Sequence, residues 1–218
     1  MKDLLTRILS SAASAMWRNE PTLGRYTRET AEHELNLAFH YAAELRGWFP
    51  WLDCDFDVTK LNFNRERPDI ILHRRNTGLN FLVIEVKRAG RAAGVKADLK
   101  KIRDHWFAGG LRYRFGASVV LDEPNHSFAI RLLSRDDSER ELTLSKAALS
   151  KPVSRPEFCP DCAVLISLAD QIVAAQRAGH RAAITRLEQK MDAQFREQYD
   201  AQPRIERVLK RHPKCRLL

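Results

Sequence analysis

Two carboxylates and a lysine on neighbouring predicted strands are the strongest candidates for chemistry in the chain. Asp69 opens the apolar run 69–74, and Glu85 and Lys87 close the apolar run 79–87. Side chains two residues apart in a β-strand share a face, so Glu85 and Lys87 point the same way. Burying a charge is costly unless the charge is paired or coordinated, so these two side chains need partners.

Asp69 supplies such a partner if the two runs pair as a hairpin. Asn, Thr and Gly at residues 76–78 suit a tight turn between the runs. Asp69 and Glu85 then form an oxygen site for Mg²⁺ or Mn²⁺, because hard divalent cations prefer oxygen ligands. A metal-bound water can serve as the nucleophile in such a site. Lys87 would orient this water or offset the charge that develops on a phosphate.

Pro68-Asp69 followed by Glu85-Val86-Lys87 resembles the motif of the PD-(D/E)XK nuclease superfamily, which includes many restriction endonucleases. The resemblance covers residues 27–133, where the predicted order of helices and strands is similar to the core of that superfamily. The chain looks most like a group of small bacterial members of uncertain biological role. The resemblance implies a Mg²⁺-dependent DNA endonuclease, acting in restriction or phage defence, with Asp69, Glu85 and Lys87 as its catalytic residues.

The same resemblance implies a further acidic residue at the metal, because many members add a glutamate from the first core helix. Glu32 is the candidate, since it lies one turn before Leu35 on the packed side, and Glu34 is the alternative. A helix N-terminus also attracts glutamates through its dipole alone, so both glutamates have a second explanation.

The elements that must position these residues follow from hydrophobic periodicity. Helical spacing alternates with strand-like runs in the order helix, three strands, helix, two strands. This order predicts an α/β domain over residues 1–150, with a restriction endonuclease-like core in which helices flank a central mixed β-sheet. Helices are predicted over 3–16, from Thr27 or Thr30 to Arg46, and over 96–107, and strands over 53–58, 69–74, 79–87, 115–121 and 128–133.

Residues 151–218 are predicted to form a helical hairpin tail after a linker at 152–156, with a break at Gly179. Each predicted helix carries an apolar stripe, which would pack on the other helix or on a second copy of the chain as a homodimer. The stripes consist of Leu165, Leu168, Ile172 and Val173, and of Ile184, Leu187, Met191 and Phe195.

Two ligand pairs with the same spacing suggest a structural zinc site in the tail. Cys159 and Cys162 form one pair, and His212 and Cys215 form the other. Three thiolates and one imidazole suit tetrahedral Zn²⁺ if the hairpin brings its ends together. The competing interpretation leaves all four side chains without metal, and the long interval between the pairs favours it.

The charge balance favours a polyanionic partner, most simply DNA. The 218 residues carry a formal charge of +9, and their mixture of 44% hydrophobic and 30% charged residues argues against a disordered chain. No apolar run is long enough for a membrane span or a signal peptide, so a cytoplasmic protein with no membrane partner is expected. The candidate nucleic-acid contacts are Arg74, Arg88, Lys96, Lys100, Lys101 and Arg103. Each of them is explained equally well as a solvated surface charge.

A second class of function fits the same basic surface. The chain would then be a nucleic-acid-binding module that does not cut, serving in a larger complex. The two hypotheses differ in whether cleavage that depends on Mg²⁺ or Mn²⁺ is lost when Glu85 or Lys87 is replaced while binding is retained.

Overall fold

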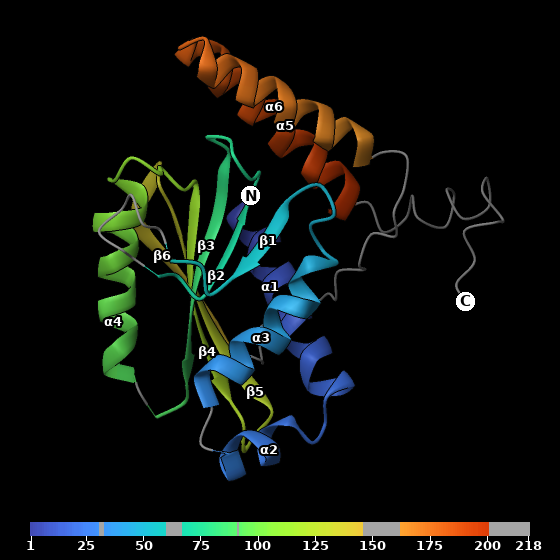
Figure 1. Cartoon of the computed structure of the whole chain (residues 1–218), viewed down its shortest axis with the longest axis vertical. Coiled ribbons are helices and arrows are strands. Elements are labelled where there is room, and N and C mark those ends of the chain that lie inside the picture. The colour runs from blue at the N-terminus through green and yellow to red at the C-terminus, as the bar shows by residue number, and fades with distance from the viewer. Residues whose placement is uncertain (31–32, 60–66, 91, 146–161, 201–218) are drawn as a thin grey trace, which may run out of the picture.

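A six-stranded mixed sheet with helices on both faces forms the centre of the protein (Figure 1). The computed structural model describes residues 1–30, 33–59, 67–90, 92–145 and 162–200. The predicted α/β class with a mixed sheet and flanking helices is therefore confirmed. Its elements are α1 (Lys2–Asn19), α2 (Leu23–Thr30), α3 (His33–Arg46), β1 (Asp53–Phe56), β2 (Ile70–His73), β3 (Asn80–Arg88), α4 (Ala92–Lys101), the π-helical segment η1 (Ile102–Phe107), β4 (Phe115–Asp122), β5 (Ser127–Ser134), β6 (Asp137–Ser145), α5 (Cys162–Arg177) and α6 (Arg181–Asp200).

The strands lie in the sheet in their chain order, from β1 to β6. Only β3 and β4 are parallel, and α4 with η1 makes the crossover between them. The other neighbours are antiparallel, including the predicted β2–β3 hairpin, whose turn places Asn76 at φ 59°. The sheet thus joins two meanders through one central parallel pair.

Two elements differ from the sequence prediction. The helix expected from Thr27 or Thr30 to Arg46 corresponds to α3, which ends at Arg46, whereas the separate helix α2, which begins at Leu23, was not predicted. The edge strand β6 was not predicted, because its sequence DSERELTLS has many polar residues and no continuous apolar run. An edge strand needs less apolar side-chain area than a central strand, which weakens the signal in its sequence.

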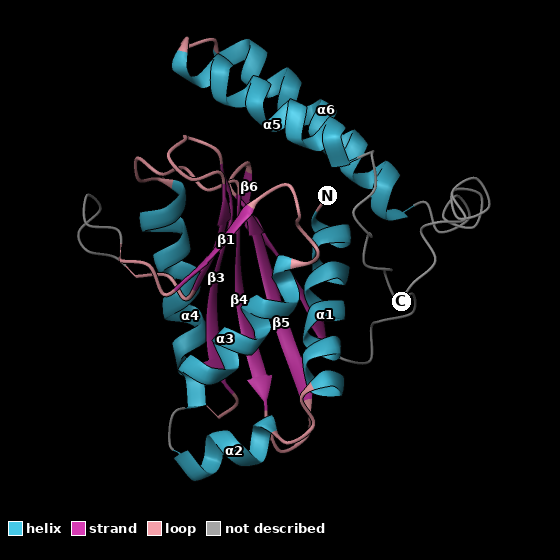
Figure 2. Ribbon diagram, turned by 45° about the vertical axis from the view of Figure 1, so that its right-hand side comes forward, coloured by secondary structure: helices cyan, strands magenta, loops and turns pink. Residues whose placement is uncertain are grey.

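The sheet separates two apolar cores, and Figure 2 shows the helices that cover its two faces. Leu82, Ile84 and Val86 of β3 pack in the larger core with α1 and α3, whereas Val83 packs in the smaller core with α4 and η1. This alternation matches the predicted strand pattern. Phe81 departs from it, because it packs in the larger core near the point where the β2–β3 register shifts.

Helices α5 and α6 pack on each other and on one end of the sheet (Figure 1). Much of the two predicted apolar stripes packs within the chain, since the larger core includes Leu165, Ile172, Met191 and Phe195. Gly179 ends the turn between the helices at φ 70°, a conformation that glycine adopts without strain. The homodimer and the division near residue 150 stay predictions. Among the described residues, no helix is long and apolar enough to cross a membrane.

Replacing Phe195 by alanine is expected to destabilise the whole chain by about 3–5 kcal/mol. Phe195 is fully buried and stacks on Phe49 with ring centroids 6.0 Å apart, so the loss would leave a cavity between α6 and the sheet. Urea unfolding followed by tryptophan fluorescence measures the change. Lys190→Ala, on the exposed side of the same helix, is the control and should change stability by less than about 0.5 kcal/mol. Equal effects of the two variants would contradict the docking of α6.

Candidate active site

Asp69 lies beside the strand that carries Glu85. Ile70 pairs with Ile84 in the antiparallel β2–β3 ladder, so the residue before Ile70 comes next to Glu85 and Val86. The backbone N–H of Val86 donates a hydrogen bond of 2.6 Å to Asp69 Oδ2. This bond holds the Asp69 carboxylate beside the carboxyl end of β3, close to Glu85, as the sequence pattern predicted.

Glu85 is a buried carboxylate, with only 3% of its surface exposed. Lys101 Nζ lies 2.9 Å from Glu85 Oε1, and Trp106 Nε1 donates a hydrogen bond of 3.3 Å to the same oxygen. Burial raises the pKa of Glu85 to about 7, and the nearby charge of Asp69 adds to the rise while Lys101 opposes it. A cation in addition to the Lys101 ammonium group would therefore stabilise the charged form of Glu85.

Lys87 lies between two acidic side chains from different helices. Its Nζ is 3.8 Å from Asp98 Oδ1 on α4 and 4.0 Å from Glu34 Oε2 at the start of α3. It also donates to the Val86 carbonyl oxygen at 3.2 Å. Glu34, the alternative in the sequence prediction, thus lies at the site, whereas Glu32, the preferred candidate, lies outside the described residues.

Asp98, on the crossover helix α4, was missed as a site residue. Asp98 is 7% exposed, and its Oδ2 has no hydrogen-bond partner within the described part of the chain. Burial is the main cause that raises its pKa, and Lys87 opposes the rise. Its position in the sequence contained a signal, since it lies three residues after Val95 and four before Ile102 on the buried face of the helix.

These side chains form one electrostatic unit, which we call the acidic cluster. Burial is the first cause that raises the pKa of Asp69, and the Val86 N–H, Lys87 and Lys101 oppose it. Glu34 raises the pKa of both Asp69 and Asp98, so the carboxylates repel one another across the site. The acidic cluster consists of Glu34, Asp69, Glu85 and Asp98, with Lys87 and Lys101 between them.

The acidic cluster fits a cation held by two carboxylates. Mg²⁺ is commonly bound through one or two carboxylates and retains several waters, so Asp69 and Glu85 are the residues that could hold it. The orphaned Oδ2 of Asp98 and the mutual repulsion of buried carboxylates are features that a cation would relieve. Within the described ranges, no group of three or more His, Cys, Asp or Glu side chains is arranged to hold a metal.

The basic residues predicted to contact nucleic acid have different surroundings. Arg74 lies at the opposite end of β2 from Asp69 and pairs with Asp170 of α5 at 2.6 Å. Arg88 Nε is 3.2 Å from the buried Glu123. Lys101 forms an ion pair with Glu85, and Lys100 forms one with Asp104. Lys96 is exposed and Arg103 is half-buried on the crossover.

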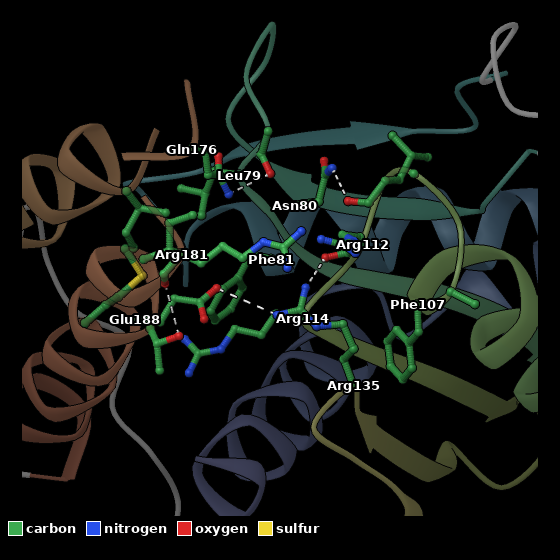
Figure 3. A pocket seen from close by; sticks show the side chains of 18 of the residues that line it. Leu79, Asn80, Phe81, Phe107, Arg112, Arg114, Arg135, Gln176, Arg181 and Glu188 are labelled. Carbon is green, nitrogen blue, oxygen red and sulfur yellow. Dashed lines mark hydrogen bonds and ion pairs between the residues drawn. The ribbon is translucent and has the colours of Figure 1, made fainter. Parts of the chain in front are cut away.

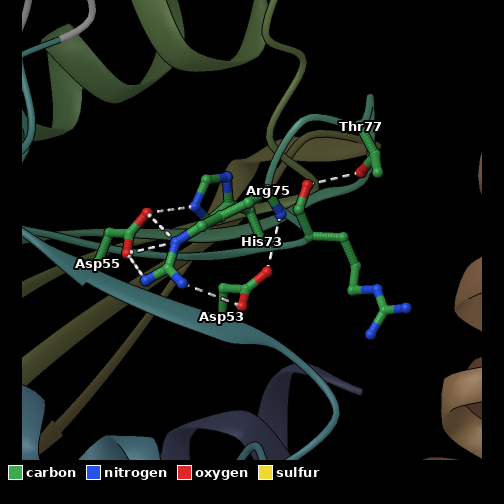
Figure 4. A network of polar contacts seen from close by, with 6 residues as sticks. Asp53, Asp55, His73, Arg75 and Thr77 are labelled. Carbon is green, nitrogen blue, oxygen red and sulfur yellow. Dashed lines mark hydrogen bonds and ion pairs between the residues drawn. The ribbon is translucent and has the colours of Figure 1, made fainter.

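A second polar network occupies the other end of β2 (Figure 4). Asp55 Oδ2 lies 2.8 Å from His73 Nε2, and Arg75 Nε donates a hydrogen bond of 3.0 Å to Asp55 Oδ1. Asp53 accepts a hydrogen bond of 2.8 Å from the Arg75 backbone N–H. The bond from Arg75 is the first cause that lowers the pKa of Asp55. This network fastens β1 to the hairpin and does not join the acidic cluster.

The predicted zinc ligands lie beyond what the structure describes. Cys159, His212 and Cys215 fall outside the described residues, and Cys162 is described only as the first residue of α5. Among the side chains that are described, Cys54 is a free cysteine whose pKa is raised to about 11 by burial. The zinc site stays a prediction.

The free energy of unfolding is expected to fall as pH rises from about 4.5 to about 7 because of Glu85. Its pKa is about 7 in the folded chain, against an ordinary value of 4.5, so in this window the folded state holds the proton and the unfolded state loses it. The contribution is on the order of 3 kcal/mol. Urea unfolding between pH 4.5 and 8, with EDTA, measures it in wild type and Glu85→Gln. A pH dependence as steep in Glu85→Gln as in wild type would contradict this assignment.

Comparisons of the chain with models of protein families, with curated proteins and with solved structures found no match. The geometry of the acidic cluster is therefore the main guide to function.

Proposed function

We propose that the chain is a metal-dependent endonuclease of the PD-(D/E)XK type, which hydrolyses phosphodiester bonds of DNA. The observation that carries the proposal is the meeting of Asp69 and Glu85, from two adjacent strands, with Lys87 in a buried acidic cluster. An ordinary ion pair at a strand end would need no more than one carboxylate for one lysine. Here several carboxylates share two lysines, which favours a site that takes up an additional cation.

Each residue of the proposed site has a role that follows from its position. Asp69 and Glu85 would hold Mg²⁺ or Mn²⁺, which when bound supplies positive charge at the phosphate and an activated water. Lys87 would orient that water and offset charge on the phosphate in the transition state. Asp98 and Glu34 hold the Lys87 ammonium group from two sides and act as its positioning residues.

Lys101 is proposed to have two partners in succession. In the structure it neutralises Glu85 at 2.9 Å, and about a quarter of its side chain is exposed. When a cation takes over the Glu85 charge, the Lys101 ammonium group becomes available for a DNA phosphate. Lys96, Lys100 and Arg103 on the same crossover would extend this contact along the backbone of the nucleic acid.

DNA is proposed as the substrate from the resemblance to restriction endonucleases and from the formal charge of +9. A setting in restriction or phage defence and a homodimer that cuts both strands belong to the same proposal. Arg74 and Arg88 already have acidic partners, so they are weaker candidates for the DNA contact than Lys96.

Mg²⁺ or Mn²⁺ is expected to raise the melting temperature of the protein in the absence of any substrate. At a hundredfold excess over the dissociation constant, the increase should be about 5 °C or more. It should be larger at pH 8 than at pH 5.5, because the proton competes with the cation for Glu85, whose pKa is about 7. Differential scanning fluorimetry measures the shift, and Glu85→Gln should abolish it. An equal shift in wild type and Glu85→Gln would place the cation elsewhere.

Lys87→Ala is expected to lower the rate of DNA cleavage by about a hundredfold to a thousandfold with little loss of DNA binding. The rate is measured on supercoiled and linear DNA with Mn²⁺, and binding is measured by fluorescence anisotropy in Ca²⁺. Lys190→Ala is the control, since it removes the same charge from an exposed position on α6, outside the acidic cluster and the proposed DNA contacts. Wild-type protein that binds DNA but cuts neither DNA nor RNA would overturn the nuclease and favour the non-cleaving module.

A further inference from the structure

A pocket of about 670 Å³ lies between one end of the sheet and the α5–α6 hairpin (Figure 3). Its walls come from the start of β3, from residues 107–114 before β4, and from both helices of the hairpin. Asn80 and Glu85 are five residues apart on β3, which corresponds to about 17 Å of strand. The pocket is therefore separate from the acidic cluster, although the same strand contributes to both.

Basic side chains outnumber acidic ones in and beside this pocket. Four arginines line it, namely Arg112, Arg114, Arg135 and Arg181, whereas Glu188 is the one acidic residue in its lining. Asp192 and Asp136 lie beside Arg114 and Arg135 and offset part of this charge. The surplus positive charge favours an anion.

Arg114 is the buried anchor of the group. It is 9% exposed, and its Nη2 donates a hydrogen bond of 2.6 Å to Asp192. Its Nε and Nη1 have no hydrogen-bond partner in the described part of the chain. Burying guanidinium donors without partners is costly, and a nearby anion would reduce that cost.

Arg135 and Arg112 flank the anchor in more accessible positions. Arg135 Nη1 donates a hydrogen bond of 2.7 Å to the Arg112 carbonyl oxygen, which ties the two residues together. Arg135 Nη2 is 4.0 Å from Glu188 Oε1, too far for a hydrogen bond. Figure 3 shows these arginines and Glu188 around the same space. Guanidinium groups are planar and can pair with two oxygens of a phosphate at once, so arginines that line one pocket are suited to bind one.

The remainder of the pocket suits an organic body attached to that anion. Amide groups are present as well, since Gln176 donates to the Gly78 carbonyl oxygen at 3.1 Å while its own Oε1 is buried without a partner among the described residues. The volume lies in the range of pockets for small organic ligands. The apolar part of the lining consists of Leu79, Phe81, Phe107, Leu111, Ile172, Ile184 and Met191.

We propose that this pocket binds a small organic phosphate of about nucleotide size. The phosphate contacts Arg112 and Arg135 near the buried charge of Arg114, and the organic part lies against the apolar wall and the Gln176 amide. Because the hairpin and the sheet both contribute walls, the ligand also joins α5 and α6 to the rest of the chain. The proposal does not depend on the nuclease activity.

Isothermal titration calorimetry with the full-length chain tests the proposal. The probes are the four nucleoside 5′-monophosphates, glucose 6-phosphate and inorganic phosphate, each titrated separately. At least one organic phosphate is expected to bind more tightly than inorganic phosphate, and the two organic arms distinguish a nucleotide from a sugar phosphate. Arg135→Gln and Arg112→Gln should each weaken binding by about tenfold or more.

Two further variants separate loss of the pocket from loss of the fold. Arg177→Gln removes the same charge from an exposed position on α5 outside the pocket and should leave binding unchanged. Glu188→Gln removes the acidic group and should tighten binding by about threefold, a gain that a misfolded variant would not show. Absence of binding by every organic phosphate, binding no tighter than that of inorganic phosphate, or equal binding by Arg135→Gln would overturn the proposal.

Discussion

The buried carboxylate of Glu85 is the constraint around which the centre of the structure is arranged. A charge in the middle of an apolar sheet must be compensated, and the compensation comes from Lys101 and Trp106 at the end of the crossover. The crossover continues from α4 into a π-helical segment, which directs Trp106 under the strand. Asp69 is held at the same edge by the Val86 backbone. The cost of burying these neighbouring carboxylates is the physical basis of the cation site that we propose.

Strand β3 connects the two regions to which we assign ligands. Its carboxyl end carries Glu85 and Lys87, and its beginning carries Asn80 and Phe81 beneath the α5–α6 hairpin. The stretch between them is buried on both faces, so the strand is a rigid support. The hairpin is attached by an aromatic cluster at Phe195 and by the Arg114–Asp192 ion pair. Beside these contacts, the hairpin and the end of the sheet do not meet, and the arginine pocket lies between them.

The sequence predicted the sheet well where the signal is local. The β2–β3 hairpin follows from two apolar runs around a turn with Asn76 and Gly78, and the strand alternation placed Val83 and Ile84 on opposite faces. Two elements were not predicted, namely β6, whose polar edge sequence has no strong period, and the short helix α2. Asp98 was not predicted as a site residue, although its helical spacing from Val95 and Ile102 placed it on the buried face.

Asp69, Glu85 and Lys87 could be singled out from the sequence, because they lie on two strands joined by a short turn. Local geometry alone brings such residues together. The groups that surround them could be identified from the tertiary structure. Lys101, Asp98 and Glu34 approach from helices whose packing depends on contacts distant in sequence, and no local period encodes that approach. The same reason applies to the arginine pocket, whose walls come from segments far apart in the chain.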